Sequence, residues 1–212
     1  PKLLYAPDYG IPQMRKRVFF VGLRDENAEF EFPEGFVEKE NYITCEDAIS
    51  DLPTLQTESG EIIYGDDVQE YLHEPQSEYQ KKMRMNSEKV FNHIGSIPIE
   101  KTKKMIALVP EGKNYKALPE EYQGIYKYHE ALTRYHSKKP SNTINTGHRS
   151  HFHYKWNRIP TVRESARLQS FPDDFIFYGN KSEQYRQVGN AVPPMLGQVV
   201  AIKLKEYLKG RE

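Results

Sequence analysis

Apolar residues are regularly spaced near the two ends of this chain and irregularly spaced between them. Residues 17–23 form an almost continuous apolar run, which predicts a β-strand buried on both faces, as in a sheet covered by helices. After Pro193 and Pro194, apolar residues recur every three or four positions and predict an amphipathic helix that ends near Gly210. The stripe of that helix contains Leu196, Val199, Val200, Lys203, Leu204, Tyr207 and Leu208.

Two further helices are predicted from polar residues that can cap their N-termini. Thr161 stands three residues before Glu164, which is the spacing of a capping box, and the helix that follows should stop by Pro172. Thr44 is placed in the same way before a shorter helix over residues 44–52.

The charge of the chain changes sign along its length, although the net charge is zero. Residues 25–78 hold 17 acidic side chains against one basic side chain, whereas residues 79–212 hold 24 basic against 12 acidic. A DNA duplex would repel the first segment, an acidic linker, and attract the second. Within the second, residues 80–89 are predicted as a basic helix, and residues 110–160 as irregular chain with weak strand signals at 141–146.

Composition narrows the class of protein further. No run of 18 apolar residues occurs, so the sequence predicts no membrane-spanning helix. Cys45 is the single cysteine, which permits no internal disulfide and no thiolate metal cluster and favours a reducing compartment such as the cytoplasm. Residues 1–6 contain neither a starting methionine nor a signal-peptide core, and we expect the chain to be part of a longer one.

Three stretches carry the candidate chemistry. Gln13, Arg15 and Arg17 alternate as the chain enters the first predicted strand, so both guanidinium groups can face one target. The planar donor fork of arginine suits a carbonyl or phosphate oxygen. Residues 161–173 form the second stretch, the capped helix. Residues 187–194, Gln-Val-Gly-Asn-Ala-Val-Pro-Pro, form the third, with a glycine that permits a positive φ before the helical prolines.

In this order, the three stretches resemble conserved blocks VIII, IX and X of DNA (cytosine-5) methyltransferases. The resemblance is close over residues 5–24 and 138–208 and loose between them. It implies an enzyme that transfers a methyl group from S-adenosylmethionine to C5 of a cytosine flipped out of double-stranded DNA. The nucleophilic cysteine, the catalytic glutamate and the main cofactor loop of this family precede these blocks, and we find no counterpart of them here.

The resemblance also implies roles for individual residues. Arg17 matches the arginine that donates to O2 of the flipped cytosine, where attack at C6 pushes negative charge into the ring. Arg15 and Gln13 match its supporting neighbours. Asn190 matches the asparagine that binds the methionine part of S-adenosylmethionine, which gives a partial cofactor site. The backbone of Ala191 and Val192 lies beside it, and the residues expected to brace the recognition domain against the catalytic domain are Arg163, Glu164 and Arg167.

Sequence recognition is expected in residues 134–158, where basic side chains alternate with aromatic ones, as suits phosphate and base-edge contacts. Thr143 matches a family threonine that touches the DNA backbone near the target base, and Gln13 and Arg149 are predicted to bind DNA. The basic side chains of this segment are Arg134, Lys138, Lys139, Arg149, Lys155 and Arg158. No cysteine or carboxylate stands near its histidines, so we expect no metal at His148, His151 and His153.

Cys45 is not expected to be the nucleophile, because the carboxylates beside it raise its pKa, and we predict a small core residue instead. The predicted fold class is α/β: the C-terminal part of a Rossmann-like methyltransferase domain (residues 1–24 and 161–212) and a small irregular mixed target recognition domain. The acidic linker and that recognition domain occupy residues 25–160.

Two hypotheses remain open. In the first, the chain is part of a methyltransferase and needs the N-terminal catalytic half, on the same polypeptide or on a separate subunit. In the second, it is a non-catalytic, sequence-specific DNA-binding module. The apolar stripe of the C-terminal helix favours the first, since a free-standing module should not expose such a face. A restriction endonuclease is disfavoured, because the sequence lacks a convincing core of paired carboxylates and lysine.

Overall fold

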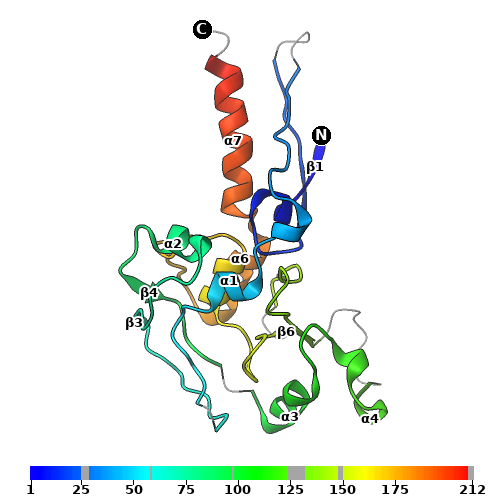
Figure 1. The fold of residues 1–212 in the computed structure, drawn as a ribbon, viewed down its shortest axis with the longest axis vertical. Coiled ribbons are helices and arrows are strands. Elements are labelled where there is room, and N and C mark those ends of the chain that lie inside the picture. Colours follow the sequence, from blue (N-terminus) through cyan, green and yellow to red (C-terminus); the bar gives the residue numbers. More distant parts are fainter. Residues whose placement is uncertain (25–28, 58, 97, 124–131, 148–149, 210–212) are drawn as a thin grey trace.

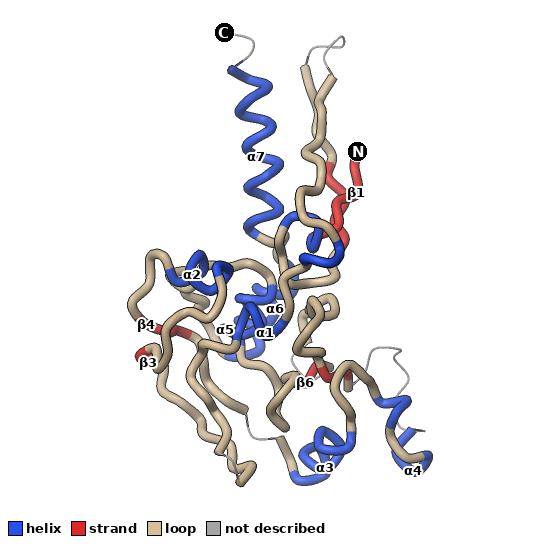
Figure 2. The backbone as a smooth tube through the Cα atoms, in the orientation of Figure 1, coloured by secondary structure: helices blue, strands red, loops and turns tan. Residues whose placement is uncertain are grey.

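The computed structural model describes residues 1–24, 29–57, 59–96, 98–123, 132–147 and 150–209. Helices and loops dominate these residues, and the strands are short (Figures 1 and 2). The α-helices are α1 Cys45–Ile49, α2 Glu78–Arg84, α3 Glu100–Leu108, α4 Glu120–Gln123, α5 Val162–Leu168, α6 Lys181–Asn190 and α7 Pro194–Lys209. The 3₁₀ helices are η1 Ala6–Tyr9, η2 Lys39–Asn41 and η3 Tyr115–Ala117.

Six strands pair into three two-stranded sheets within the described residues. β1 (Lys2–Tyr5) and β2 (Lys16–Phe19) are antiparallel, with Leu4 opposite Arg17. β3 (Val68–Glu70) and β4 (Lys89–Phe91) are also antiparallel, whereas β5 (Thr133–Arg134) and β6 (His151–Phe152) are parallel. The larger parallel sheet of a Rossmann-like domain is therefore not seen in this part of the chain, and the Rossmann assignment stays a prediction.

The first predicted strand is present but is not buried on both faces, so that prediction is wrong for this structure. Within the described residues, β2 pairs with β1 and no helix covers its outer face. As a result Val18 is 52% exposed and Phe20 is 80% exposed. On β1, Leu3 is 53% exposed.

The predicted helix caps are confirmed. In α5, Thr161 accepts from the Glu164 amide while the Glu164 carboxylate accepts from the Thr161 amide, and the helix ends before Pro172. Thr44 and Asp47 make the same reciprocal pair at α1. The basic helix lies at α2, earlier than residues 80–89, because Ser77 caps it and β4 begins at Lys89. Helix α6 was not predicted.

Three apolar clusters hold these elements together. The largest joins α1, α2, α5 and α6 and includes Cys45, Tyr79, Leu168 and Val188. A second lies around α3 and β6. A third packs Leu4 and η1 against the first two turns of α7. Beyond those turns α7 extends beside the segment that carries Phe30, whose ring contacts Tyr207 edge-on (Figure 1).

Candidate functional site

Gln13 lies at a junction between sequence-distant segments. Its fully buried side chain donates to the Leu168 carbonyl (3.4 Å) and to Oε1 of Gln169 (3.2 Å), and accepts from the Ile144 amide (3.1 Å). Backbone hydrogen bonds between residues 12–14 and Ser141 add to the same contact. The start of the chain, the recognition segment and the end of α5 are therefore fixed relative to one another.

Arg15 extends this junction to the third motif. Nη1 donates to the Ile144 carbonyl at 2.9 Å, and Nη2 donates to the carbonyls of Gly189 (2.6 Å) and Ala191 (3.1 Å). The side chain is 1% exposed. The expectation that Arg15 and Arg17 face one target is therefore wrong in this structure, because main-chain carbonyls already occupy Arg15. This geometry fits a supporting residue.

Gln169 was missed by the sequence analysis, yet it completes the junction. Its Nε2 donates to the Val188 carbonyl (2.5 Å) and to the Ala191 carbonyl (3.0 Å). The side chain is fully buried at the C-terminal cap of α5. The sequence offered little signal for this role, because Gln169 and Ser170 are both polar and lie between Leu168 and Phe171.

Gly189 is required for close packing and not for a positive φ. It lies inside α6, and its φ is not positive. A Cβ atom at this position would lie 2.5 Å from the carbonyl carbon of Asn145 and 2.7 Å from the amide nitrogen of Thr146. The third motif is therefore the end of a helix that packs closely against residues 145–146, and Gly189 does not adopt the positive φ that the sequence analysis allowed for.

Arg17 and Thr143 flank the junction on its more open side. Arg17 is half-buried, its Nη1 donates to the Lys16 carbonyl (3.0 Å), and partial burial lowers the pKa of its guanidinium. Thr143 donates through Oγ1 to the Met14 carbonyl at 2.6 Å, which holds it next to the Gln13–Arg17 segment. Gln13 was also predicted to bind DNA, which is wrong in this structure because its side chain is fully buried and hydrogen-bonded inside the fold. Arg149, the remaining predicted DNA contact, lies outside the described residues.

The predicted cofactor residues lie where α6 gives way to α7. Asn190 is exposed, Ala191 is half-buried, and Val192 is 44% exposed. The Ala191 carbonyl is held from below by Arg15 and Gln169, so the position of this surface segment depends on the buried junction. An exposed carboxamide beside an apolar side chain suits the charged and apolar parts of S-adenosylmethionine.

Arg167 and Arg163 of α5 are buried and tie distant segments together. Arg167 pairs with Asp173 (Nε to Oδ1, 2.6 Å) and Asp51 (Nη1 to Oδ1, 2.9 Å). Burial alone would lower the pKa of Arg167, but the two carboxylates raise it. Arg163 donates to the carbonyls of Phe91, Pro172 and Phe175, at 2.7 to 3.0 Å.

Glu164 is the centre of a buried charged cluster. It receives two hydrogen bonds from Arg158, at 2.5 and 2.7 Å, and its Oε1 lies 3.7 Å from Nε2 of His153. Burial would raise the pKa of Glu164, but Arg158 holds it well below its ordinary value. All three predicted bracing residues join separate segments of this chain. Their role between two domains stays a prediction.

The predicted recognition surface over residues 134–158 is largely internal, which corrects the sequence analysis. Arg134 is 5% exposed and donates to the carbonyls of Ile106 (2.5 Å) and Val109 (2.7 Å). Arg158 is 1% exposed and paired with Glu164. These arginines satisfy carbonyls and a carboxylate inside the fold, so they are not free to bind phosphate. Lys138, Lys139 and Lys155 remain exposed.

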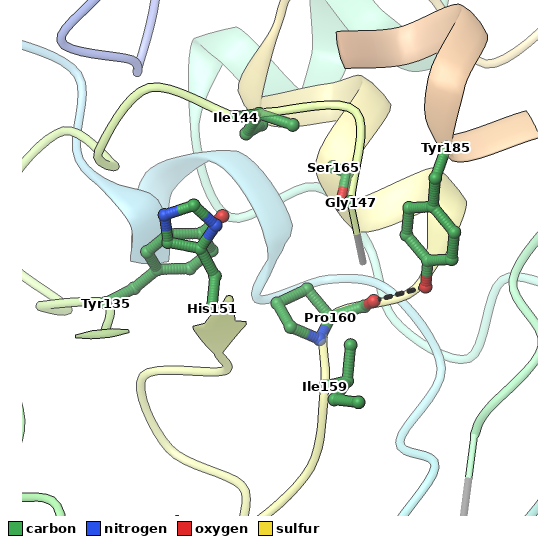
Figure 3. Close-up of a pocket in the computed structure, with 8 residues that line it drawn as sticks. All are labelled: Tyr135, Ile144, Gly147, His151, Ile159, Pro160, Ser165 and Tyr185. Carbon is green, nitrogen blue, oxygen red and sulfur yellow. Dashed lines mark hydrogen bonds between the residues drawn. The ribbon is translucent and has the colours of Figure 1, made fainter. Parts of the chain in front are cut away.

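A small cavity lies between Tyr135, His151 and Tyr185 (Figure 3). Its volume of about 10 Å³ is that of a single water molecule, so it is no substrate pocket. His151 lines it, stacks on Tyr135 at 5.2 Å, and has a buried Nε2 without a hydrogen-bond partner in this structure. Tyr185, on another wall, donates to the Pro160 carbonyl at 2.6 Å.

Cys45 is a structural residue. Cys45 is fully buried in the main core, as predicted, and burial together with Glu111 and Asp47 raises the pKa of its thiol. In the described parts of the chain, no group of three His, Cys, Asp or Glu side chains could hold a metal ion. His148 lies outside them. Among the same residues, no helix has the length and apolarity needed to cross a membrane.

Comparison with known proteins gives consistent matches. The family model described as C-5 cytosine-specific DNA methylase matches residues 1–206. Type II methyltransferase M.DdeI of Desulfomicrobium norvegicum is 35% identical over 98% of this chain and 54% of its own length. Type II methyltransferase M1.HphI of Haemophilus parahaemolyticus is 38% identical over 94% of this chain and 46% of its own length. The chain thus spans about half the length of these relatives.

A solved structure shares the fold. The crystal structure of a provisionally assigned DNA modification methyltransferase, encoded within a prophage (E. coli), superposes with a TM-score of 0.73. The superposition covers 98% of this chain and 60% of that one, at 21% sequence identity. The likeness at this identity concerns the fold alone, which is methyltransferase-like with mixed helices and small sheets.

Proposed function

The chain belongs to the C-5 cytosine-specific DNA methylase family, and on that premise we propose that it forms the DNA-recognition and C-terminal part of a DNA (cytosine-5) methyltransferase. The reaction is transfer of a methyl group from S-adenosylmethionine to C5 of a cytosine flipped from double-stranded DNA. Its relatives are type II methyltransferases, which favours a role in restriction–modification.

One observation carries the proposal: Arg15 binds the carbonyls of Ile144, Gly189 and Ala191 at once. It thereby brings the segment of Arg17 beside the segment of Asn190. A target base and a methyl donor must meet in one place, and the two motifs that would contact them are held by one buried guanidinium.

In this proposal Arg17 donates to O2 of the flipped cytosine. Addition of a nucleophile at C6 places negative charge on the ring, and a cation fixed at O2 stabilises that charge as it develops. Arg15 and Gln13 act by positioning, because both side chains are buried and their hydrogen bonds hold other segments of the fold. Thr143 and Arg149 contact the DNA, with Thr143 held through the Met14 carbonyl.

Asn190 and the backbone of Ala191 and Val192 would hold the methionine part of S-adenosylmethionine, and the bound cofactor would supply an electrophilic methyl group. These residues make a partial site. Cys45 is buried with a raised thiol pKa, so we infer that the nucleophile and the rest of the cofactor site come from another part of the protein.

The exposed apolar surface favours this reading over a free-standing DNA-binding module. On the β1–β2 hairpin, Leu3, Val18 and Phe20 are 53%, 52% and 80% exposed, and on α7 Ile202 and Leu208 are 49% and 63% exposed. Hairpin and helix lie side by side through the cluster of Leu4 with Leu196 and Val200 (Figure 1). A catalytic half that packs against this surface would bury the exposed apolar side chains of both the hairpin and α7.

The test is methyl transfer by the full protein, with labelled S-adenosylmethionine and unmethylated DNA, followed by nucleoside analysis. We expect 5-methylcytosine; methylation of another base position, or none, would overturn the proposal. If the catalytic half is a separate subunit, mixing it with this chain should restore transfer that neither shows alone. A DNA-binding module would bind the duplex and never support transfer.

A further inference from the structure

The burial of Arg134 and Arg158 leaves open which surface meets the DNA backbone beside Thr143. An open groove of about 520 Å³ lies next to that residue. Its lining includes Gly112, Lys113, Asn114, Lys116, Thr133 and Asn142, the last being the neighbour of Thr143 in sequence. The sequence analysis did not single out residues 112–117.

We propose that this groove, with Lys113 as its principal cation, binds the sugar–phosphate backbone of the DNA substrate. The inference rests on the proposed function, since it assumes that the protein acts on duplex DNA. It adds a contact site that extends the phosphate path from Thr143 along the surface.

The chemistry of the lining suits an anion. Among the described residues, the lining presents two lysines, two asparagines and a threonine, and no carboxylate. Lysine, asparagine and threonine are among the residues that contact phosphate oxygens in protein–DNA interfaces. The nearest acid in sequence, Glu111, accepts from the Ser137 amide and lies 3.6 Å from Nδ1 of His136, so it is engaged outside the groove.

The wall that carries Lys113 is fixed by the same arginine that the sequence analysis assigned to DNA. The Arg134 amide donates to the Lys113 carbonyl (2.9 Å), and the Gly112 amide donates to the Arg134 carbonyl (3.1 Å). Gly112 has φ +72°, where a side chain would be strained and its Cβ would lie 2.9 Å from the His136 ring. The exposed Lys113 side chain therefore projects from a rigid turn.

Another lining residue, Asn142, connects the groove to the segment of Gln13, Arg15 and Arg17. Asn142 lies between Ser141, which exchanges backbone hydrogen bonds with residues 12–14, and Thr143, which donates to the Met14 carbonyl. Arg17 follows three residues after Met14. A duplex that presents its cytosine to Arg17 and its backbone to Thr143 would continue past Asn142 toward Lys113.

Lysine is a flexible point charge without the donor fork of arginine, so the groove should add affinity and not base selectivity. Lys113→Gln in the full protein should lower the slope of log K against log salt by about 0.9, the value for one lost phosphate contact. Binding to a site-containing duplex and to a random duplex of equal length should weaken by the same factor.

The measurement is fluorescence anisotropy with a labelled 30-base-pair duplex at several NaCl concentrations. Lys113→Arg keeps the charge and should keep the slope. The matched control is Lys82→Gln, a lysine on α2 that is also exposed, on the far side of the molecule from α4 (Figure 1). Thermal unfolding of each variant verifies the fold.

An unchanged slope for Lys113→Gln overturns the inference, and so does a loss confined to the site-containing duplex, which would indicate base readout. If the wild-type protein makes 5-methylcytosine while Lys113→Gln keeps the wild-type slope, the groove does not bind the DNA backbone and the proposed function stands. If the wild type neither binds nor methylates DNA, both fall.

Discussion

Nη2 of Arg15 lies 2.6 Å from the carbonyl oxygen of Gly189, although the two residues are 174 positions apart in the chain. The same guanidinium reaches the Ile144 carbonyl at 2.9 Å. Three segments that carry separate motifs are thus joined by one buried cation, which accounts for the need for arginine at this position. Lysine has no fork with which to span three carbonyl oxygens.

Gly189→Ala should break this junction. The added methyl group would press against the Asn145 and Thr146 backbone, which cannot rotate away as a side chain could. We expect a loss of about 1–3 kcal/mol in the free energy of unfolding, measured by chemical denaturation. The control is Gly197→Ala in α7, where nothing lies within 4 Å of the new Cβ and alanine should stabilise the helix by about 1 kcal/mol. Equal effects at both positions would contradict the close packing.

Asp173→Asn should lower the stability of the fold, because Asp173 and Asp51 are the carboxylates that pair with buried Arg167. Arg167 and Asp173 are both fully buried, and loss of one carboxylate leaves charge on Arg167 and Arg163 less compensated. We expect a loss of about 3 kcal/mol in unfolding free energy. Glu78→Gln, which breaks the exposed pair with Lys81, should cost less than about 1 kcal/mol. A small effect at Asp173 would show that Asp51 alone suffices.

Acid should destabilise the fold through buried histidines. Burial lowers the pKa of His93 and His151 to about 4 and that of His153 to about 3, against 6.5 ordinarily. The unfolded chain therefore binds more protons below pH 6.5, and stability is lost as the pH falls from there toward 4. At pH 5 each histidine of pKa about 4 should cost roughly 2 kcal/mol.

His151→Phe tests the acid effect at one site, because phenylalanine can keep the stacking on Tyr135 without a titrating nitrogen. The variant should unfold like the wild type at pH 7.5 and lose less stability than the wild type at pH 5. The measurement is the midpoint of thermal unfolding across this pH range. A variant with the wild-type pH dependence would mean that His151 does not titrate as a buried neutral group.

The helix caps and α7 could be predicted because their signals are local. Thr161 and Glu164 specify a helix start whatever surrounds them, and α7 begins at Pro194 as its spacing indicates. The direction of Arg134 and Arg158 could not be predicted. Basic and aromatic residues alternate in a DNA-binding surface, and they alternate equally in a core where arginines bind carbonyls and a glutamate.

The exposure of Phe20 could not be predicted either, because it also depends on contacts with distant parts of the structure. An apolar run indicates that a strand will be covered, but the cover is supplied by other elements, and within the described residues none lies over β2. For Gly189, the sequence specified a small residue without revealing whether backbone angle or packing required it. Only the position of Asn145 settles that question.

The central claim is that Arg17 stabilises charge on the target cytosine, and the most direct test compares kcat with the Kd for DNA in Arg17→Ala of the full protein. We predict that kcat falls about 100- to 1000-fold, the loss typical of one removed transition-state donor, while the Kd changes far less. Lys16→Ala removes the neighbouring exposed basic side chain and should change the Kd for DNA without lowering kcat. Equal losses of kcat and affinity in Arg17→Ala would contradict the account and make Arg17 a phosphate contact.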